Sequence, residues 1–251
     1  MTHICLNEKY EALKEFVERI PERIGCDGEV LRDGRNLIKV MTTPDGLRLN
    51  VKRYHIPRWP NRLIYSLNIR KPKGLRAYLY PSILLKAGIQ TPENVAYIEE
   101  RSFGLMGYSY FVSLQCDYGR ELYEVGRAAD DGIYNDLAVA LGRFTAKMHD
   151  ADLLHRDYSP GNILWKQDAD GFHFSIIDIN RLYFGPVSME LGCSNFSRLW
   201  GSKQFIETVV SEYARQRGFD VQQATTAAMK HRERFWKRYL KKHDAPFNVE
   251  L

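Results

Sequence analysis

The sequence predicts an α+β fold built from two lobes, a β-rich lobe followed by a helical lobe. Short runs rich in Val, Ile and Leu, separated by turn residues, dominate the first half of the chain. Patterns of helical periodicity dominate the second half, and a short connector near residues 114–120 joins the two parts. We therefore expect one lobe at residues 1–115 and the other at residues 116–251, lengths that can bury a core.

The first half contains most of the predicted strands. Residues 7–20 carry apolar side chains at helical spacing, and Pro21 is expected to end that helix. The runs EVLR, NLIKVM and LRLNVKRY are separated by two Asp-Gly hairpin dipeptides and predict a three-stranded antiparallel meander. A helix near residues 76–87 and two more strands, in NVAYIEER and SYFVSLQC, are expected to complete this lobe.

The second half begins with a strong amphipathic pattern at residues 134–150, which predicts a helix. The segment FHFSIIDINRLYF has the pattern of a strand pair or of a strand and a turn, and helical patterns follow from Ser188 onward. The sequence shows no internal repeat and no low-complexity linker. Two lobes of this kind are expected to leave a cleft between them, the usual place for a ligand.

The composition, 44% apolar and 27% charged residues, indicates a soluble globular protein. No stretch approaches the roughly 20 apolar residues of a membrane span. The N-terminus has charges where a signal peptide has its apolar core, so we expect a cytoplasmic protein. The four cysteines form no CxxC pair and are expected to be reduced and free of metal: Cys5, Cys26, Cys116 and Cys193.

Positive charge is concentrated in one block of the chain. Residues 46–92 contain ten Lys or Arg and no Asp or Glu. A block of one sign attracts anions such as nucleotide phosphates, acidic sugars, anionic lipid headgroups or nucleic acid. The alternative is a solvated basic surface that aids solubility. Within this block, residues 52–76 interleave Trp59 and Tyr65 with basic residues and are a candidate contact for an acidic acceptor or an anionic membrane.

A second basic segment lies near the C-terminus. Seven Lys or Arg lie between Lys230 and Lys242, and Phe235, Trp236 and Tyr239 recur on one side of the predicted helix. A basic amphipathic helix of this kind can lie on an anionic membrane. The more common alternative, which we favour, is a terminal helix that docks its aromatic side chains on the helical lobe. Nucleic acid is the less favoured partner, because no nucleic-acid fold signature accompanies the basic segments.

The stretch LLHRDYSPGNILW carries the most specific chemical signal. His155, Arg156 and Asp157 are followed by Asn162, which is the H-R-D-x-x-x-x-N spacing of a kinase catalytic loop. Phosphoryl transfer needs a carboxylate to accept a hydroxyl proton and oxygen ligands that hold Mg²⁺ on the phosphates of ATP. Asp157 is predicted to be the base and Asn162 a magnesium ligand.

Two further residues extend this pattern along the chain. The apolar run SIIDIN ends in Asp178, where a kinase has the metal-binding Asp of D-F-G, with Ile179 and Asn180 in place of Phe and Gly. Upstream, LNVKRY places Lys52 on the third predicted strand, where a kinase lysine holds the nucleotide phosphates. All four positions in this order are far more specific than an isolated HRD triplet.

The loop expected to cover the phosphates contains little glycine. LRDGRNLIKV offers Gly34 but no G-x-G-x-x-G. Backbone amides of Gly34, Arg35 and Asn36 are predicted to bind the phosphates instead. The expected cofactors are therefore ATP and Mg²⁺.

The chain resembles the lipopolysaccharide-core kinase family, the Kdo and heptose kinases with a protein-kinase-like fold. The resembling segments are GRNLIKV, LNVKRY, AGIQTPENVAYIE, HRDYSPGNIL and IDINRLYFGP, and they span residues 30–200. The resemblance implies a nucleotide-binding N-lobe and a C-lobe with the catalytic loop and acceptor site. It also implies ATP-dependent phosphorylation of a Kdo or heptose hydroxyl on the lipid A–core glycolipid, at the inner face of the inner membrane.

Two departures from protein kinases favour a non-protein acceptor. Ser159 stands where protein Ser/Thr kinases usually carry a Lys, two residues after the catalytic Asp. No A-P-E segment, which shapes a peptide-binding surface, follows Asp178. Both departures favour a glycolipid or another small acceptor; a different glycan, another small molecule or a protein is the alternative.

A third departure concerns activity. Kinases pair the strand lysine with a Glu on the next helix, but the aligned position here is Leu79. Pro81 should also confine or kink the predicted helix. A pseudokinase that acts as a scaffold is therefore the non-catalytic alternative. Otherwise Lys52 is held by nucleotide alone or by one of three acids: Asp178, Glu99 or Glu100.

Overall fold

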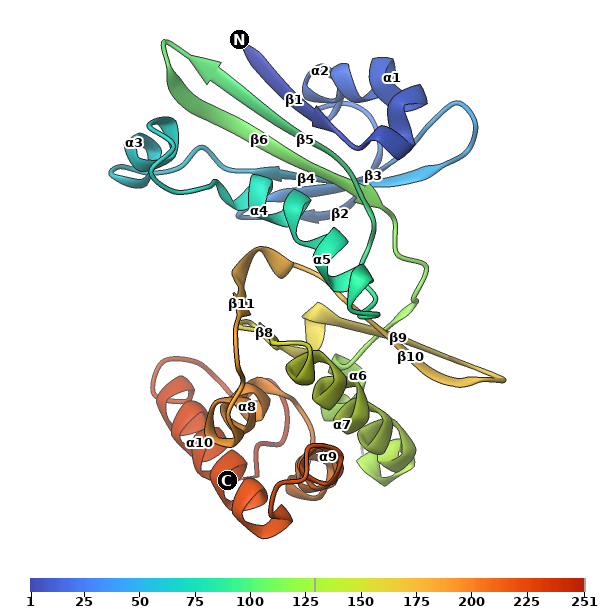
Figure 1. Ribbon diagram of the computed structural model, residues 1–251, viewed down its shortest axis with the longest axis vertical. Helices are drawn as coiled ribbons and strands as arrows, with labels where there is room; N and C mark the ends of the chain where they lie inside the picture. The colour runs from blue at the N-terminus through green and yellow to red at the C-terminus, as the bar shows by residue number, and fades with distance from the viewer. Residues whose placement is uncertain (129, 251) are drawn as a thin grey trace. The chain divides into compact units, whose positions relative to one another are not determined.

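A computed structural model describes residues 1–128 and 130–250 of the chain. The chain divides into two compact units. Unit 1 comprises Met1–Lys86 and Thr91–Asp117, and unit 2 comprises Ala87–Gln90 and Tyr118–Leu251. Strands are the main secondary structure of unit 1 and helices that of unit 2 (Figure 1), as the predicted α+β class requires.

Unit 1 contains a fully antiparallel sheet. Within the described residues it has six strands in the order β1-β5-β6-β4-β3-β2. The predicted meander is β2, β3 and β4, whereas β1, which pairs with β5, was not predicted. The strands are β1 (Thr2–Leu6), β2 (Glu29–Asp33), β3 (Leu37–Thr42), β4 (Arg48–Tyr54), β5 (Asn94–Ser102) and β6 (Leu105–Leu114).

The helices of unit 1 are short, and two prolines explain where they begin. The prediction that Pro21 ends the first helix is wrong. Pro21 lies in the first turn of α2, where the missing N–H costs no hydrogen bond. Pro81 divides the helix predicted at residues 76–87 into two. The elements are η1 (Glu8–Leu13), α1 (Lys14–Glu18), α2 (Ile20–Arg23), α3 (Asn61–Ser66), α4 (Lys73–Leu79) and α5 (Pro81–Lys86).

The two faces of the sheet are covered by different helices, as Figure 1 shows. Val17 of α1 and Ile20 of α2 are fully buried in one core with Val51 of β4. On the opposite face, α4 packs against the ring of Tyr97; a Cβ atom at Gly74 would lie only 2.8 Å from that ring. Glycine at this position therefore allows α4 to approach the sheet closely.

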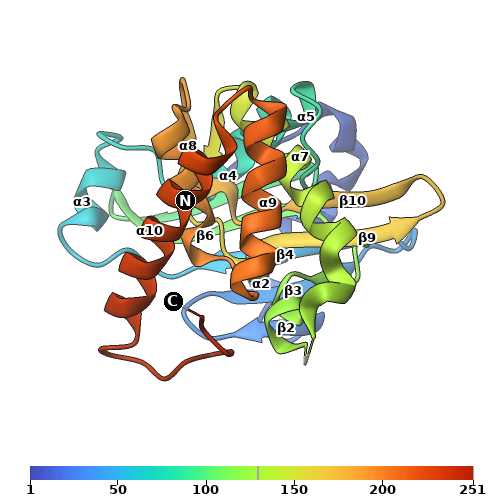
Figure 2. The same ribbon diagram turned by 90° about the horizontal axis from the view of Figure 1, so that it is seen from below.

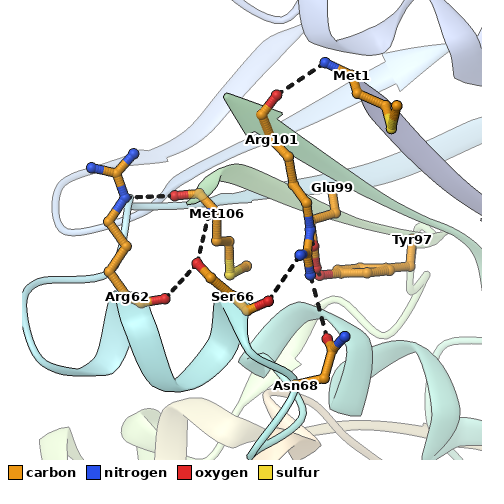
Figure 3. A network of polar contacts seen from close by, with 8 residues as sticks. All are labelled: Met1, Arg62, Ser66, Asn68, Tyr97, Glu99, Arg101 and Met106. Carbon is orange, nitrogen blue, oxygen red and sulfur yellow. Dashed lines mark hydrogen bonds and ion pairs between the residues drawn. The ribbon is translucent and has the colours of Figure 1, made fainter. Parts of the chain in front are cut away.

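A network of polar contacts holds α3 against one end of β5 and β6 (Figure 3). Arg62 Nε donates to the Met106 carbonyl at 2.8 Å, and the Ser66 hydroxyl accepts from the Met106 amide at 2.9 Å. Arg101 Nη1 donates to the Ser66 carbonyl at 3.0 Å, while its Nε contacts the buried carboxylate of Glu99 at 2.6 Å. These bonds fix α3 to the sheet.

Unit 2 contains several helices and two small sheets. In its described residues the sheets have the orders β10-β9-β7 and β11-β8. The helix predicted at residues 134–150 is α7. The elements are β7 (Arg120–Glu121), α6 (Tyr123–Arg127), η2 (Asp131–Tyr134), α7 (Asn135–Asp150), β8 (Leu153–His155), η3 (Pro160–Asn162), β9 (Ile163–Asp168), β10 (Gly171–Ile176), η4 (Ile179–Arg181), β11 (Leu182–Phe184), α8 (Met189–Asn195), η5 (Phe196–Arg198), α9 (Lys203–Gln216) and α10 (Val221–Tyr239).

The long helices of unit 2 pack closely on one another (Figure 2). Helix α9 lies beside α7, and α10 contacts α8, α9 and η5. Trp236 of α10 is only 2% exposed, and its ring lies 5.1 Å from that of Phe247. The C-terminal helix thus docks its apolar side on unit 2, the arrangement favoured from the sequence. No helix in the described part of the chain is long and apolar enough to cross a membrane.

Candidate active site

The predicted catalytic loop lies between β8 and η3. His155 at the end of β8 is buried, and burial lowers the pKa of its imidazole. The ring is held at both nitrogens: Nδ1 accepts from the Asp157 amide at 3.2 Å, and Nε2 donates to the Ile177 carbonyl at 3.0 Å. This pattern requires a neutral imidazole, in agreement with the lowered pKa. The histidine therefore organises the loop and does not act as an acid or base.

Three predicted site residues meet in one part of unit 2. The Ile177 amide donates to the Asn162 carbonyl at 3.0 Å, so the end of β10 brings Asp178 next to the start of β9. Asn162 Nδ2 donates to the Asp157 carbonyl at 2.9 Å. Asp157, Asn162 and Asp178 thus come together from two segments of the chain.

The donor atoms near Asp178 suit a magnesium ion held partly by phosphates. The amide nitrogen of Asn162 bonds to Asp157 and Ser159, which leaves the amide oxygen to act as a ligand. Asp178 has a left-handed backbone with φ of 56° and accepts a hydrogen bond from Asn180. No group of three or more His, Cys, Asp or Glu that could hold a metal occurs among residues 1–128 and 130–250. Magnesium keeps several waters and needs few protein ligands, so this set fits it.

The Asp157 carboxylate has a partner that the sequence did not predict. Arg198 Nη1 lies 2.5 Å from Asp157 Oδ1. The Arg198 guanidinium also lies 5.3 Å from the ring centre of Phe235 on α10. Buried Arg232, on the same helix, donates to the Leu199 carbonyl at 2.6 Å. Helix α10 thereby holds the segment that carries Arg198, and the ion pair depends on this packing.

A buried chain of hydrogen bonds, also unpredicted, reaches the catalytic loop from α9. Asn195 Nδ2 donates to the His155 carbonyl at 2.9 Å, and Asn195 Oδ1 lies 3.3 Å from His149 Nε2. His149 Nδ1 lies 3.0 Å from the Tyr213 hydroxyl, which accepts from Arg217 at 2.7 Å. Burial lowers the pKa of His149 to about 3, so the ring is neutral and can donate from one nitrogen and accept at the other.

The predicted phosphate anchor, Lys52, lies on β4 in unit 1. The antiparallel register aligns Tyr97, Phe111, Lys52 and Ile38 in one row across the sheet. Because partners in a row share a face, Lys52 lies on the face that α4 covers. Its Nζ is 5.3 Å from the ring centre of Tyr54, the next residue of β4 on that face.

The sheet distinguishes among the acids proposed as partners for Lys52. Glu100 accepts from the Tyr110 hydroxyl at 2.7 Å and belongs to the opposite face, so it cannot reach Lys52. Glu99 shares the face of Lys52 but is bound in the network of Figure 3. Asp178 belongs to unit 2. Helices α4 and α5 carry no acidic residue, as the sequence requires.

The predicted phosphate-covering residues form the exposed turn between β2 and β3. Gly34, Arg35 and Asn36 lie just before β3, whose first residue pairs with Arg53. The turn therefore lies at the Lys52 end of β4. Asn36 Oδ1 accepts from the His55 amide at 3.4 Å, which links the turn to the chain after β4.

Comparison with known proteins gives consistent results. The model of the lipopolysaccharide kinase (Kdo/WaaP) family matches residues 50–184. Among solved structures, WaaP in complex with acyl carrier protein is similar with a TM-score of 0.62 and 17% identity over 96% of this chain and 100% of that chain. Amicoumacin kinase hAmiN in complex with AMP-PNP, Ca²⁺ and Ami is similar with a TM-score of 0.50 and 11% identity over 95% and 96%. No curated protein matches the sequence.

These similarities establish the fold and the family. The solved structures show that the fold is protein-kinase-like, as predicted. The matched residues 50–184 are more than half of the chain and include Lys52, Asp157, Asn162 and Asp178. The chain therefore belongs to the lipopolysaccharide kinase (Kdo/WaaP) family and is a protein-kinase-like sugar kinase of the lipopolysaccharide core.

Proposed function

We propose that the chain transfers the γ-phosphoryl group of ATP to a Kdo or heptose hydroxyl of the lipid A–core glycolipid, with Asp157 as the general base. The observation that carries this proposal is the convergence of Asp157, Asn162 and Asp178 in unit 2. A scaffold has no use for a base and two oxygen ligands at one point, so this convergence favours a kinase over a pseudokinase.

The Asp157 carboxylate accepts the proton of the acceptor hydroxyl as that oxygen attacks the γ-phosphorus. The bond between the γ-phosphorus and the β–γ bridging oxygen breaks, and ADP leaves with the electron pair. The proton on Asp157 then returns to solvent. Phosphoryl transfer depends mainly on positioning and charge stabilisation. The buried hydrogen bonds of His155 and Asn195 would therefore contribute to catalysis by keeping the loop that carries Asp157 in place.

Asn162 and Asp178 would hold Mg²⁺ on the phosphates of ATP, and its charge neutralisation would be the chemistry it supplies there. The buried amide oxygen of Asn180 supports this assignment, because it has no hydrogen-bond partner in the described part of the chain. A buried acceptor without a donor costs free energy. A water molecule bound to the ion would supply that donor.

Unit 1 would bind the nucleotide and unit 2 the acceptor, in line with lobes at residues 1–115 and 116–251. Lys52 would bind the phosphates, and the amides of Gly34, Arg35 and Asn36 would cover them. The exposed turn that these three residues form, at the Lys52 end of β4, supports this role.

The decisive experiment incubates the full chain with Mg-ATP and purified lipid A–core and measures the acceptor by mass spectrometry. The expected product gains one phosphate, and the Asp157→Asn chain gives none. If ATP is hydrolysed and the glycolipid stays unmodified, the acceptor is wrong, and a radiolabel screen over sugars, small molecules and proteins would identify the acceptor class. If Mg-ATP neither stabilises the chain against heat nor is hydrolysed, the scaffold alternative is correct.

We also propose that the enzyme meets its glycolipid at an anionic membrane surface through the segment 52–76. Between residues 56 and 69, exposed apolar side chains alternate with basic ones. The apolar side chains, with exposed fractions from 38% to 71%, are Ile56, Trp59, Leu63, Leu67 and Ile69. The basic residues in and after this stretch are Arg58, Arg62, Arg70, Lys71 and Lys73. Apolar side chains can enter the headgroup region while basic ones attract anionic lipid.

The other basic segment, Lys230–Lys242, is a weaker candidate for this contact. Its tryptophan, Trp236, is buried in unit 2, and Phe235 lies against Arg198. The helix therefore exposes basic side chains to solvent, while Phe235 and Trp236 are packed within unit 2. Segment 52–76 exposes Trp59 beside its basic residues, on a part of the chain that the network of Figure 3 holds in place. Tyr65, the other aromatic residue named from the sequence, is instead buried in unit 1, because its side of α3 packs on the sheet. Such a contact would place the enzyme at the inner face of the inner membrane.

A further inference from the structure

A cavity of about 460 Å³ lies next to the catalytic loop within unit 2. Its walls come from β8, β11, α8 and η5. The polar side chains that line it include Arg156, Tyr183, Ser194, Ser197 and Arg198. The volume is within the range of small-molecule sites and is sufficient for a sugar unit.

The charge of this cavity is one-sided. Arg156 and Arg198 contribute two guanidinium groups, and the described lining residues include no Asp or Glu. The Arg156 guanidinium lies 5.6 Å from the ring centre of Tyr183, which restricts where the side chain can point. Guanidinium groups bind carboxylate and phosphate in a planar, two-bond geometry, so two of them in one cavity favour an anionic ligand.

Arg198 connects the cavity to the base. Its Nη1 bonds to Asp157 Oδ1, so one guanidinium group faces both the cavity and the carboxylate that must accept the proton. An anion in the cavity would compete for Arg198. An acceptor without an anion would leave Arg198 on Asp157.

We propose that this cavity binds an anionic substituent of the acceptor sugar through Arg156 and Arg198, and that this binding draws Arg198 away from Asp157. The inference rests on the proposed function and narrows its acceptor to a sugar that carries a carboxylate or a phosphate near the reacting hydroxyl. Arg156 is then a specificity-determining residue. Arg198 is a positioning residue that leaves the base available when the correct acceptor is bound.

The first test measures binding, which needs no turnover. Calorimetry on the full chain compares four probes: the sugar acid Kdo, its neutral carboxyl methyl ester, a neutral heptose and a heptose phosphate. The expected result is a preference of about 10-fold or more for an anionic probe over its neutral counterpart, the size of one charge-assisted hydrogen bond. Preference for Kdo assigns the cavity to a carboxylate, and preference for the heptose phosphate assigns it to a phosphate.

The same measurements on Arg156→Gln and Arg198→Gln should abolish that preference. Arg215→Gln is the matched control, because Arg215 is exposed on α9 and pairs with Glu212 at 3.5 Å. Equal binding of the charged and neutral probes, binding of none of them, or an unchanged preference in both arginine variants would overturn the proposal.

Kinetics with the preferred acceptor distinguish a binding role from a structural one. Arg156→Gln should raise KM for the anionic acceptor and leave KM for the neutral one unchanged, whereas a folding defect would affect both. If the anion preference is present but no acceptor is phosphorylated, the proposed function fails and the cavity assignment stands. If the chain phosphorylates the charged and the neutral acceptors equally well, the proposed function stands and the cavity assignment fails.

Discussion

Arg198 Nη1 and Asp157 Oδ1 lie 2.5 Å apart, so the proposed base is half of an ion pair between the catalytic loop and η5. One carboxylate oxygen is thereby oriented, and the position of Asp157 depends on the segment that α10 holds through Arg232 and Phe235. The proposed general base is therefore positioned by helices that lie later in the chain than the kinase motif itself.

Replacement of Asp157 by Asn should lower kcat by about 10²- to 10⁴-fold, the usual contribution of a general base. The amide keeps the size of the side chain, so the affinity for Mg-ATP should change by less than about twofold. Coupled ADP release measures kcat, and the Mg-ATP-dependent shift of the melting temperature measures nucleotide binding. Asp170→Asn, in the exposed turn between β9 and β10, is the matched control. A variant at Asp157 that keeps more than a tenth of the activity would show that another group accepts the proton.

Replacement of Lys52 by Met should weaken Mg-ATP binding by about 10-fold or more, because a charge-assisted contact to phosphate is lost. Arg53→Met is an unusually close control, since Arg53 is the next residue of β4, carries the same charge and points to the opposite face of the sheet. Nucleotide titration by calorimetry checks both variants. Equal affinity of the two variants would remove Lys52 from the phosphate site.

Replacement of Asn195 by Leu should reduce both stability and turnover. The change leaves the His155 carbonyl and His149 Nε2 without their partner, and each unsatisfied buried group costs about 1–3 kcal/mol. Urea unfolding measures the loss of free energy of unfolding, and kcat should fall because the catalytic loop loses its support. The affinity for Mg-ATP should change little, since Asn195 bonds to His149 and His155 and not to the proposed metal ligands Asn162 and Asp178. Full activity in a destabilised variant would limit this side chain to a structural role.

Replacement of Gly192 by Ala should disturb the same chain of hydrogen bonds from the other side. A Cβ atom at Gly192 would lie 1.9 Å from the Tyr213 hydroxyl and 3.2 Å from His149 Nδ1. The tyrosine must move, and its bond to His149 should be lost. Far-UV circular dichroism and urea unfolding should show a folded but less stable chain. Gly34→Ala is a suitable control for the stability measurements, because a Cβ atom at Gly34 would have no other atom within 4 Å. Gly218→Ala is not suitable, because Gly218 has a positive φ that an alanine rarely adopts.

The stability of the chain should fall as pH decreases below about 6.5. The pKa of His149 is about 3 in the folded chain against an ordinary value of 6.5, so between these values the unfolded chain binds a proton that the folded chain does not. Protons in this window therefore favour unfolding, by about 1.4 kcal/mol for each pH unit from this one group. Burial lowers the pKa of His155 as well, which adds in the same direction. Urea unfolding between pH 5 and pH 8 measures the slope, and His149→Gln should reduce it; an unchanged slope would contradict the assignment.

The site could be predicted from the sequence where its geometry is local and could not where it depends on packing. Asp157 and Asn162 share one loop, and pairing of the neighbouring strands β9 and β10 brings Asp178 to them. Arg198 and Asn195 reach the loop from 41 and 40 residues away, through the packing of α8 and η5, and no local spacing indicates such contacts. The prediction that Pro21 ends a helix was wrong for a similar reason. The apolar periodicity of residues 7–20 does not reveal that this segment consists of successive short helices, so that Pro21 lies at the start of one.

Removal of the exposed apolar side chains near α3 should abolish binding to anionic vesicles. The combined change Leu63→Ser, Leu67→Ser and Ile69→Ser replaces three side chains that are 42%, 61% and 71% exposed, so the fold should tolerate it. Co-sedimentation with phosphatidylcholine vesicles, with and without phosphatidylglycerol, measures binding. The unmodified chain should bind only the anionic vesicles and should release them as salt rises. Neutralisation of Arg58, Arg70 and Lys71 should weaken binding by about 1 kcal/mol for each charge.

Control variants distinguish binding through segment 52–76 from non-specific hydrophobic adsorption to vesicles and from binding through the C-terminal helix. Ile133→Ser removes an apolar side chain that is 75% exposed in unit 2 and should leave vesicle binding intact. Neutralisation of Lys237, Lys241 and Lys242 should have a small effect, because Trp236 and Phe235 of that helix are packed against unit 2 and cannot enter the headgroup region. If that variant loses binding while the α3 variants keep it, the membrane contact belongs to α10, and segment 52–76 has another anionic ligand.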